Sequence, residues 1–326
     1  MRAFRSWGLL PLALAGGGCT RAGEGARPDS GTERALATPA TVATVSAASA
    51  VSAAPAKPAS SAPVFVVPKE QGYAPGDLKS GERAPLLVFL HGLGASGKAG
   101  FEVLGLRALG SRERIFVVAP DGTLDSKGRR FWNAHRACCD FDQRGVDDVG
   151  RLGALIDEFA TQHAVDQERI YLVGYSNGGF MAQRLACRLS DRIAAFASIA
   201  GASPEANEPC DIRGKLAALE VHGDADDVVA YDGGTLFNRA GAPRHASARE
   251  TLAFWGKRLG CEGKAKPGPS YDFDPRLAGD ETKTETFDRC RLGSAALWTV
   301  QGGTHLVGRP KLVEQVWRFL SSHRKR

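Results

Sequence analysis

The sequence predicts an α/β fold in which a mostly parallel sheet is covered by helices on both faces. Short, almost wholly apolar segments of strand length recur along the chain, segments with helical periodicity alternate with them, and glycine-rich turns follow several of the strands. We expect strands near 86–90, 115–119, 170–174, 196–200, 219–222 and 297–300, and helices near 146–163, 177–189, 247–259 and 310–323. In such a sheet the functional loops lie at the carboxyl ends of the strands.

The N-terminal segment differs in composition from the rest of the chain. Residues 1–7 carry two arginines, residues 8–15 are mostly apolar, and a run of three glycines ends at Cys19. This order is typical of a lipoprotein signal peptide over residues 1–18, after which Cys19 becomes the lipidated N-terminus. Conventional cleavage, which leaves Cys19 free, is the alternative. In both cases we expect an exported protein, and where Cys19 is lipidated we expect the lipid anchor to be its only contact with the membrane.

The segment 19–62 consists mainly of alanine, serine, threonine, proline and glycine. Such a composition cannot bury enough apolar surface to offset the entropy lost when the chain is ordered. We therefore expect a disordered tether over 19–62 and one folded domain over 63–326. The folded part is long enough for a large core, and we expect it to act as a monomer.

The first expected strand leads into a histidine-glycine turn. Residues 85–90 read Pro-Leu-Leu-Val-Phe-Leu, which suits a strand covered on both faces, and His91-Gly92-Leu93-Gly94 follows. His91 is interpreted mainly as a residue that orients this loop. Further along, Trp132 either lines a pocket or packs a loop against the core.

The most informative segment is the turn after the third expected strand. Residues 169–173 read Arg-Ile-Tyr-Leu-Val and end in Gly174-Tyr175-Ser176-Asn177-Gly178, which opens a helical pattern. A serine on a sharp strand-to-helix turn is strained, so the residues two before and two after it must be small, as glycine is. The turn lifts the hydroxyl to where a histidine can accept its proton and amides can bind an oxyanion. Ser176 is therefore the candidate nucleophile.

The loop after the strand at 216–221 carries three candidate acids. It reads His222-Gly223-Asp224-Ala225-Asp226-Asp227, and only one carboxylate can orient a catalytic histidine. Asp226 is the preferred candidate, Asp224 is its main rival, and Asp227 is the third. We interpret His222 as a structural residue.

The candidate base follows the last expected strand. Residues 295–300 are apolar, and the loop Gln301-Gly302-Gly303-Thr304-His305 can curl its histidine toward the serine. Ser176, Asp226 and His305 follow one another in the chain order expected of a serine-histidine-aspartate triad on this fold.

Two further groups of residues complete the expected site. The amides of Asn177 and Leu93 are the expected oxyanion donors, because one such donor follows the nucleophile and the other comes from the loop after the first strand. Candidate substrate contacts are His91, Trp132, Tyr175 and Tyr231.

Together these motifs resemble the α/β-hydrolase esterases that include polyhydroxybutyrate depolymerases, feruloyl esterases and acetylxylan esterases. The similarity runs from about residue 62 to the C-terminus. It covers Leu90-His91-Gly92, Pro120-Asp121-Gly122, Trp132-Asn133 with Cys138-Cys139, Val146-Asp147-Asp148-Val149, Gly174 to Gly179, Arg184-Leu185-Ala186-Cys187, and His222-Gly223 with Asp226. The resemblance implies an α/β-hydrolase fold and cofactor-free ester hydrolysis through an acyl-enzyme.

The chain departs from the family pattern at two places. Val229-Ala230-Tyr231 lacks the usual proline, and His305 is followed by Leu306-Val307-Gly308 where the family has threonine-tryptophan-proline. An aromatic residue beside the histidine is a natural platform for an aryl or polymer chain. Its absence bears on the choice of substrate and leaves the type of reaction unchanged.

We therefore expect an exported serine esterase acting on carbohydrate-linked acetyl or feruloyl esters, or on other short or aryl esters, with a polysaccharide or a polyester as the partner. Alternatives are a depolymerase of hydroxybutyrate or other hydroxyalkanoate oligomers, a serine peptidase of the same fold, and a non-catalytic surface lipoprotein. The formal charge is +6 and the basic residues are scattered, which argues against a nucleic-acid partner.

Apart from Cys19, the cysteines are Cys138, Cys139, Cys187, Cys210, Cys261 and Cys290. An even number in an exported chain predicts disulfides. We expect Cys261 to pair with Cys290, because the stretch between them is polar and loop-like. Cys138 and Cys139 are then expected to pair with the remaining two in an open order. Adjacent cysteines have poor spacing for zinc ligands, so no metal site is expected.

Overall fold

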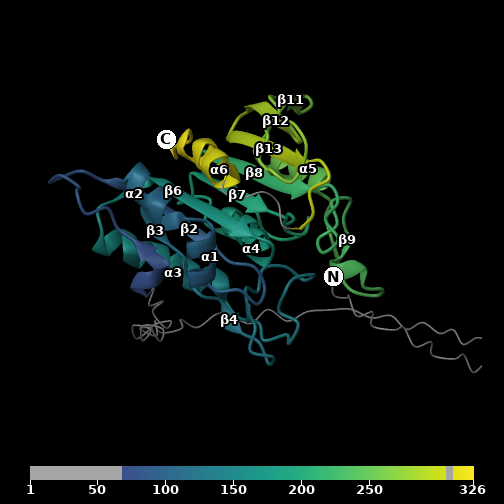
Figure 1. Cartoon of the computed structure of the whole chain (residues 1–326), viewed down its shortest axis with the longest axis horizontal. Coiled ribbons are helices and arrows are strands. Elements are labelled where there is room, and N and C mark those ends of the chain that lie inside the picture. Colours follow the sequence, from purple (N-terminus) through teal and green to yellow (C-terminus); the bar gives the residue numbers. More distant parts are fainter. Residues whose placement is uncertain (1–67, 306–310) are drawn as a thin grey trace, which may run out of the picture. The chain divides into compact units, whose positions relative to one another are not determined.

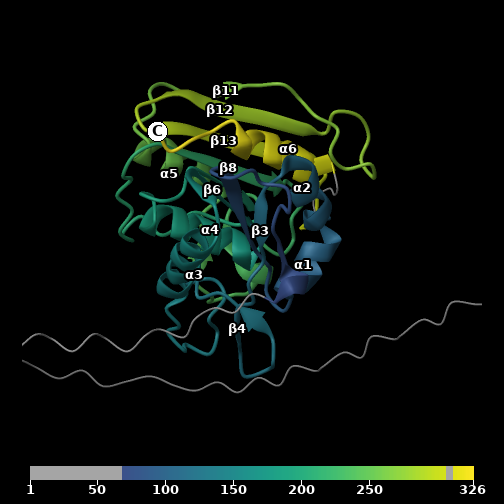
Figure 2. The same cartoon turned by 90° about the vertical axis from the view of Figure 1, so that its left-hand side faces the viewer.

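The computed structural model describes residues 68–305 and 311–326. The predicted signal peptide at 1–18, the lipidation site Cys19 and the tether at 19–62 lie outside these residues. Within the described part, a nine-stranded sheet runs in the order β1-β3-β2-β6-β7-β8-β13-β12-β11, with helices on both faces (Figures 1 and 2). The expected mostly parallel α/β fold is thereby confirmed.

The strands of the sheet fall into a parallel centre and antiparallel edges. The centre comprises β3 (Phe116–Val118), β2 (Ala84–Leu90), β6 (Val165–Tyr175), β7 (Ala195–Ile199), β8 (Leu216–Gly223) and β13 (Gly293–Val300). The edges are β1 (Gly72–Tyr73) on one side and β12 (Thr282–Cys290) with β11 (Lys266–Pro267) on the other. Two short pairs stand outside the sheet: β4 (Thr123–Leu124) with β5 (Arg130–Phe131), and β9 (Gly234–Thr235) with β10 (Arg244–His245).

Three of the described helices begin where the sequence supplies a capping side chain. The described helices are α1 (Gly97–Val103), α2 (Leu106–Glu113), α3 (Asp148–Gln162), α4 (Asn177–Arg188), α5 (Ala248–Arg258) and α6 (Lys311–Ser321), with short 3-10 turns at Lys69–Gln71 and Leu236–Asn238. The Asp147 carboxylate accepts from Gly150 N at the start of α3, and Ser247 forms a capping box with Glu250 at the start of α5.

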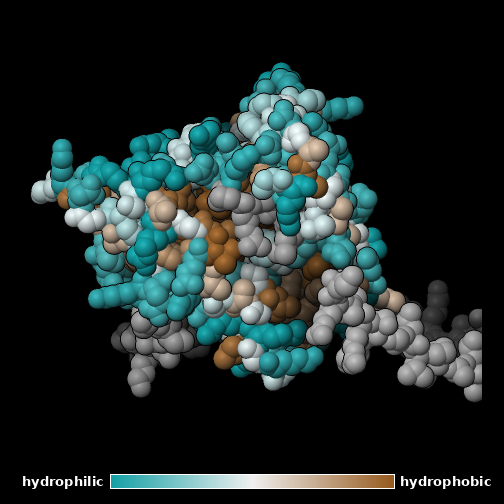
Figure 3. Space-filling view, viewed as in Figure 1, coloured by the Kyte–Doolittle hydropathy of each residue, from teal (hydrophilic) through white to brown (hydrophobic). Residues whose placement is uncertain are grey.

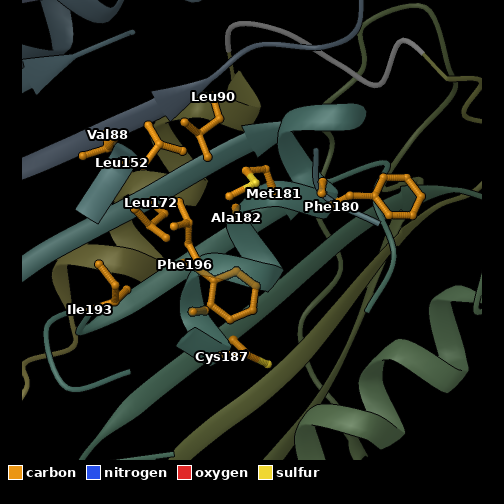
Figure 4. Packing of buried hydrophobic residues seen from close by; sticks show 14 of the residues in the cluster. Val88, Leu90, Leu152, Leu172, Phe180, Met181, Ala182, Cys187, Ile193 and Phe196 are labelled. Atoms are coloured by element: carbon orange, nitrogen blue, oxygen red, sulfur yellow. The ribbon is translucent and has the colours of Figure 1, made fainter. Parts of the chain in front are cut away.

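Two apolar cores lie on opposite faces of the sheet, because successive strand residues point to opposite sides. In β2, Leu86, Val88 and Leu90 belong to one core, while Leu87 and Phe89 belong to the other. The first core is closed by α3, α4 and α5, and the second by α1, α2 and α6 (Figure 2). Figure 4 shows part of the first core, where side chains from α3 and α4 meet those of the strands.

The structure adds elements that were not expected from the sequence, among them β1 and the short pairs β4–β5 and β9–β10, and two differences are larger. The pair α1 and α2 was not predicted, and the polar stretch before Cys290, expected to be loop-like, contains β12. Many β12 side chains are partly or fully exposed, so the strand has no apolar run that would predict it. Its hydrogen bonds with β13 hold the segment in the extended conformation.

The outer surface is mostly hydrophilic in the view of Figure 1, with hydrophobic residues gathered near its middle (Figure 3). No helix in the described ranges is long and apolar enough to cross a bilayer.

Candidate active site

The candidate nucleophile lies at the sharp turn between β6 and α4. Ser176 has φ 53° and ψ −118°, a left-handed conformation that costs free energy in a non-glycine residue. Its amide donates to the carbonyl of Ile199 at the end of β7 (2.8 Å), and its carbonyl accepts the first hydrogen bond of the helix, from Phe180 N (3.1 Å). The sheet and the helix therefore hold the strained residue from both sides.

The two glycines flanking Ser176 are required by close approach of the backbone. A Cβ on Gly174 would lie 1.9 Å from the carbonyl oxygen of Gly178, and a Cβ on Gly178 would lie 2.0 Å from that of Leu90. Neither obstacle is a side chain that could move aside. The Gly-x-Ser-x-Gly spacing thus follows from the packing of the turn against the end of β2.

Ser176, His305 and Asp226 lie within hydrogen-bonding distance in series. His305 Nε2 is 3.0 Å from Ser176 Oγ, and His305 Nδ1 is 2.8 Å from Asp226 Oδ2. A carboxylate only accepts, so Nδ1 carries the proton and Nε2 is left to accept from the serine hydroxyl. The His305 side chain is 15% exposed and the Asp226 side chain 0%, which gives a partly open base and a buried acid.

The carboxylate of Asp226 is held on both oxygens. Its Oδ1 accepts from Val228 N (2.8 Å) and Val229 N (2.9 Å), while Oδ2 faces His305 and lies 3.4 Å from His222 Nε2. Burial opposes ionisation, but the hydrogen bonds from the two histidines outweigh it and hold the pKa of Asp226 well below its usual value. The acid is therefore ionised throughout the neutral range.

The two rival acids of this loop point elsewhere. Asp224 is exposed and accepts from Gly302 N at 2.6 Å, which ties the acid loop to the histidine loop. Asp227 is also exposed. Of the three carboxylates considered, only Asp226 lies against His305.

The two expected oxyanion residues lie beside the serine. Asn177 is the first residue of α4, where amides have no acceptor within the helix and the helix dipole favours negative charge. Leu93 follows Gly92, at which a Cβ would come within 3.3 Å of Ser176 Cβ, so this loop passes directly over the nucleophile.

Trp132 and His91 are buried supports of the site, and this burial favours loop orientation and core packing over substrate contact. Trp132 is 0% exposed and His91 1%. The Trp132 indole donates to the His91 carbonyl (2.9 Å), and His91 Nε2 accepts from Gly122 N (2.9 Å) while Nδ1 faces the Gly92 carbonyl (2.8 Å). Both ring nitrogens of His91 are thus used, and burial lowers its pKa.

The Asn177 side chain joins these supports to the nucleophile turn. Its Oδ1 accepts from Trp132 N (2.7 Å) and its Nδ2 donates to Trp132 O (2.9 Å). This pair of bonds fixes the loop around residue 132 on the first turn of α4.

The remaining two candidate substrate contacts are partly buried. Tyr175 donates to the carbonyl of His305 (3.0 Å), and the Tyr231 hydroxyl is 2.8 Å from Thr299 Oγ1. Both tyrosines therefore have partners within the protein.

The disulfides in the described ranges are Cys138–Cys139, Cys187–Cys210 and Cys261–Cys290. The last is the predicted pair. The expectation that Cys138 and Cys139 pair with the other two is wrong, because Cys187 on α4 faces Cys210 and so leaves the adjacent cysteines only each other. Cys138 Sγ is 3.5 Å from Asn177 Nδ2, which puts this pair against the support of the nucleophile turn.

One buried group near the site was missed from the sequence. Glu220 is 2% exposed in the middle of β8, and its Oε1 is 3.0 Å from His222 Nδ1. A single carboxylate inside an otherwise apolar strand, two residues before a histidine, was the signal that could have indicated it.

Comparison with known proteins agrees with this geometry. The phospholipase/carboxylesterase family matches residues 78–241, which is half of the chain. The putative esterase NocK of Nocardia uniformis subsp. tsuyamanensis is 32% identical over 162 residues, covering 49% of this chain and 45% of that protein. Feruloyl esterase B of Piromyces equi is 28% identical over 245 residues, covering 73% of this chain and 42% of that protein. The chain thus spans less than half the length of either relative.

Among solved structures, an acetyl xylan esterase from Aspergillus awamori is similar, with a TM-score of 0.54 at 14% identity, covering 76% of this chain and 93% of that one. This likeness shows a shared α/β-hydrolase fold. The resemblance to esterases that the motifs indicate is confirmed, and the chain belongs to the phospholipase/carboxylesterase family.

Proposed function

We propose that the protein hydrolyses carboxylic esters, with Ser176 as nucleophile, His305 as general base and acid, and Asp226 as the residue that orients His305. Ser176 Oγ attacks the ester carbonyl while His305 Nε2 takes its proton. The tetrahedral intermediate then collapses, and His305 returns the proton to the leaving alcohol. Water releases the acyl group by the reverse path, which regenerates the serine.

The observation that carries this proposal is the position of His305 between Ser176 Oγ (3.0 Å) and Asp226 Oδ2 (2.8 Å). The three side chains come from the ends of β6, β8 and β13, so the fold brings together residues distant in sequence. The amides of Asn177 and Leu93 are proposed to bind the oxyanion. Each such donor is typically worth about 10²- to 10³-fold in rate.

The direct test is Ser176→Ala in the purified protein with an activated short-chain ester. Turnover should fall by about 10⁶-fold if the triad acts as a unit. An organophosphonate should label the parent protein at Ser176, because only an activated serine reacts readily. A variant that keeps most of its turnover, or a serine that stays unlabelled, would reject the proposal.

The choice of acid is tested with two matched carboxylate-to-amide changes in one loop. Asp226→Asn should lower kcat by about 10⁴-fold, because the amide no longer fixes the tautomer of His305. Asp227→Asn removes an equal charge from an exposed position and should leave kcat nearly unchanged. Equal effects of the two changes would contradict the assignment of Asp226.

For the substrate, we propose carbohydrate-linked acetyl or feruloyl esters, or other short or aryl esters. The support is the similarity over 73% of this chain to a protein named feruloyl esterase B. A screen of the purified protein against acetylated xylan, feruloylated sugars, hydroxybutyrate oligomers and simple aryl esters tests this choice. Preference for the hydroxybutyrate oligomers would replace it with a depolymerase activity.

We also propose export of the protein with a lipid on Cys19. The three disulfides between described cysteines support this, since disulfides persist mainly in oxidising compartments. Mass spectrometry of the mature N-terminus from the membrane fraction should find a diacylated Cys19, and Cys19→Ala should release the protein from the membrane. An unmodified Cys19 on a soluble exported protein would point to conventional cleavage.

A further inference from the structure

A second histidine lies behind the candidate acid. His222 is the penultimate residue of β8 and is 1% exposed. Its Nε2 is 2.8 Å from the carbonyl oxygen of Val229 and 3.4 Å from Asp226 Oδ2, and its Nδ1 is 3.0 Å from Glu220 Oε1. The proposed reaction uses neither His222 nor Glu220, although together they extend the series Ser176, His305, Asp226 into the protein interior.

Burial raises the pKa of Glu220, and the hydrogen bonds from its partners oppose this shift and favour its carboxylate form. Its Oε1 accepts from Gly201 N (3.2 Å), and its Oε2 accepts from Gln183 Nε2 (2.9 Å). The orientation of the Gln183 amide is fixed, because its Oε1 accepts from the Trp255 indole (2.7 Å), which can only donate. Glu220 is 2% exposed, and the small cavity that it lines with Phe196 and Trp255 has no room for a water molecule, so the protein donors stabilise its charge.

Both ring nitrogens of His222 face acceptors only. A neutral imidazole has one N–H, which would leave a lone pair directed either at the Glu220 carboxylate or at the Val229 carbonyl. Burial disfavours charge on His222, but its hydrogen bonds with Asp226, Glu220 and Val229 outweigh burial and raise its pKa to about 10. An imidazolium donates from both nitrogens and so satisfies its contacts with Glu220, Val229 and Asp226.

We propose that His222, kept as an imidazolium by Glu220, is a positioning residue for the catalytic acid Asp226. It holds Asp226 Oδ2 between two imidazoles and offsets part of the charge that Asp226 presents to His305. The catalytic effect of His222 rests on the esterase function proposed above, whereas its charge state does not.

Few other ionisable groups face His222. The Tyr231 ring stands edge-on to it with centroids 5.8 Å apart. The charge of His222 also acts on His245: burial and that charge lower the pKa of His245, while its bond with the Ala246 carbonyl and the charge of Asp226 raise it. Along this series His305 faces the carboxylate of Asp226, then the positive charge of His222, then the more distant negative charge of Glu220.

The sign of the effect follows from this order of charges. Glu220→Gln keeps the shape of the side chain. An amide nitrogen in place of Oε1 can donate to His222 Nδ1, at the cost of the bond from Gly201 N, so His222 becomes neutral at pH 7 with its proton on Nε2. The nearer positive charge is lost together with the more distant negative one. The protonated form of His305 then faces a less compensated Asp226 and is stabilised, so higher pH is needed to free the base.

The test compares pH profiles of kcat/KM for the full-length parent and its variants. In each profile the acid limb is the range in which kcat/KM falls as the pH is lowered. Glu220→Gln and His222→Gln should each shift the midpoint of this limb to higher pH by about half a unit. Each should also lower kcat about tenfold and change KM by no more than about twofold. The double variant should resemble the single ones, since the pair acts as a unit. Asp227→Asn, the exposed control in the same loop, should match the parent.

Folded variants whose acid limb stays in place or moves down would overturn the proposal, even if they are less stable. A measurement on the unmodified protein covers variants that fail to fold. Nitrogen-15 NMR of the histidine rings should show both His222 nitrogens protonated from pH 6 to pH 8, and a neutral ring would also overturn the proposal. If the protein turns over no ester at all, the proposed function fails, and the ring spectrum still decides the charge state of His222.

Discussion

The phenol of Tyr175 donates a hydrogen bond to the backbone carbonyl of His305, with 3.0 Å between the two oxygens and 5.4 Å between the ring centroids. Tyr175 immediately precedes Ser176, so the chain segment that presents the hydroxyl also supports the loop that presents the imidazole. The distance between nucleophile and base therefore does not depend on the histidine loop alone.

Tyr175→Phe removes this hydrogen bond and keeps the ring. A neutral hydrogen bond contributes about 1 kcal/mol, so we expect kcat to fall about fivefold with a small change in KM, because the base loses orientation in the transition state. Steady-state kinetics with a short aryl ester measures this. A change confined to KM would instead indicate that the phenol contacts the substrate.

Gly178→Ala should disrupt the nucleophile turn. The added Cβ would lie 2.0 Å from the Leu90 carbonyl oxygen, so β2 and α4 must separate, at a cost of about 2–3 kcal/mol. We expect a lower Tm and a large loss of kcat. Gly76→Ala is the control, since a Cβ there meets no atom within 4 Å. Thermal unfolding and steady-state kinetics of both variants measure Tm and kcat. A fully active Gly178→Ala variant would contradict the close packing of this turn against β2.

Acid should destabilise the fold through its buried neutral histidines. Burial lowers the pKa of His135 to about 4, while in the unfolded chain it titrates near 6.5. Between these values the unfolded state binds more protons, so the free energy of unfolding falls as pH drops from about 6.5 to about 4. His91, His245 and His323 are shifted in the same direction by burial.

His135→Gln tests this dependence, because the amide oxygen can still accept from Ala137 N as His135 Nδ1 does. Denaturant unfolding with intact disulfides should show that the loss of stability from pH 6.5 to 4 is smaller in the variant by roughly 3 kcal/mol. An unchanged slope would mean that His135 is charged in the fold.

The disulfide Cys261–Cys290 lies between the end of α5 and the end of β12, and it should support stability without affecting catalysis. Replacing both cysteines by alanine opens a loop of 29 residues and should cost about 3 kcal/mol. We expect a lower Tm and an unchanged kcat at 25 °C. A drop in kcat well below the melting transition would show that this region is coupled to the site.

The candidate nucleophile and candidate base could be located in the sequence because their signals are local. The turn at Ser176 has room only for glycine at positions 174 and 178, so the sequence shows the turn directly. The loop that carries His305 follows directly after an apolar strand. The chain order of serine, acid and histidine then limited the acid to one loop. The three carboxylates of that loop differ in direction and in burial, which short-range sequence patterns do not encode.

The supports of the site could not be predicted, because they depend on contacts across the fold. Trp132 and Asn177 exchange two hydrogen bonds across 45 residues, and neither residue type indicates its partner. The pairing of Cys138 with Cys139 likewise depends on where α4 places Cys187. A tryptophan near a catalytic motif suits a pocket as well as a core, and only its depth in the structure distinguishes them.

The hairpin of β12 and β13 has a consequence for how the molecule meets other chains. Without β12 and β11, the strand leading to His305 would be an outer strand with unpaired amides and carbonyls, open to pairing with a second chain. Instead β13 is bonded on both sides, and the exposed border passes to the two-residue β11, which offers little length for strand addition. A second chain that pairs with this edge of the sheet would therefore not contact β13 and would leave the position of the His305 imidazole unchanged.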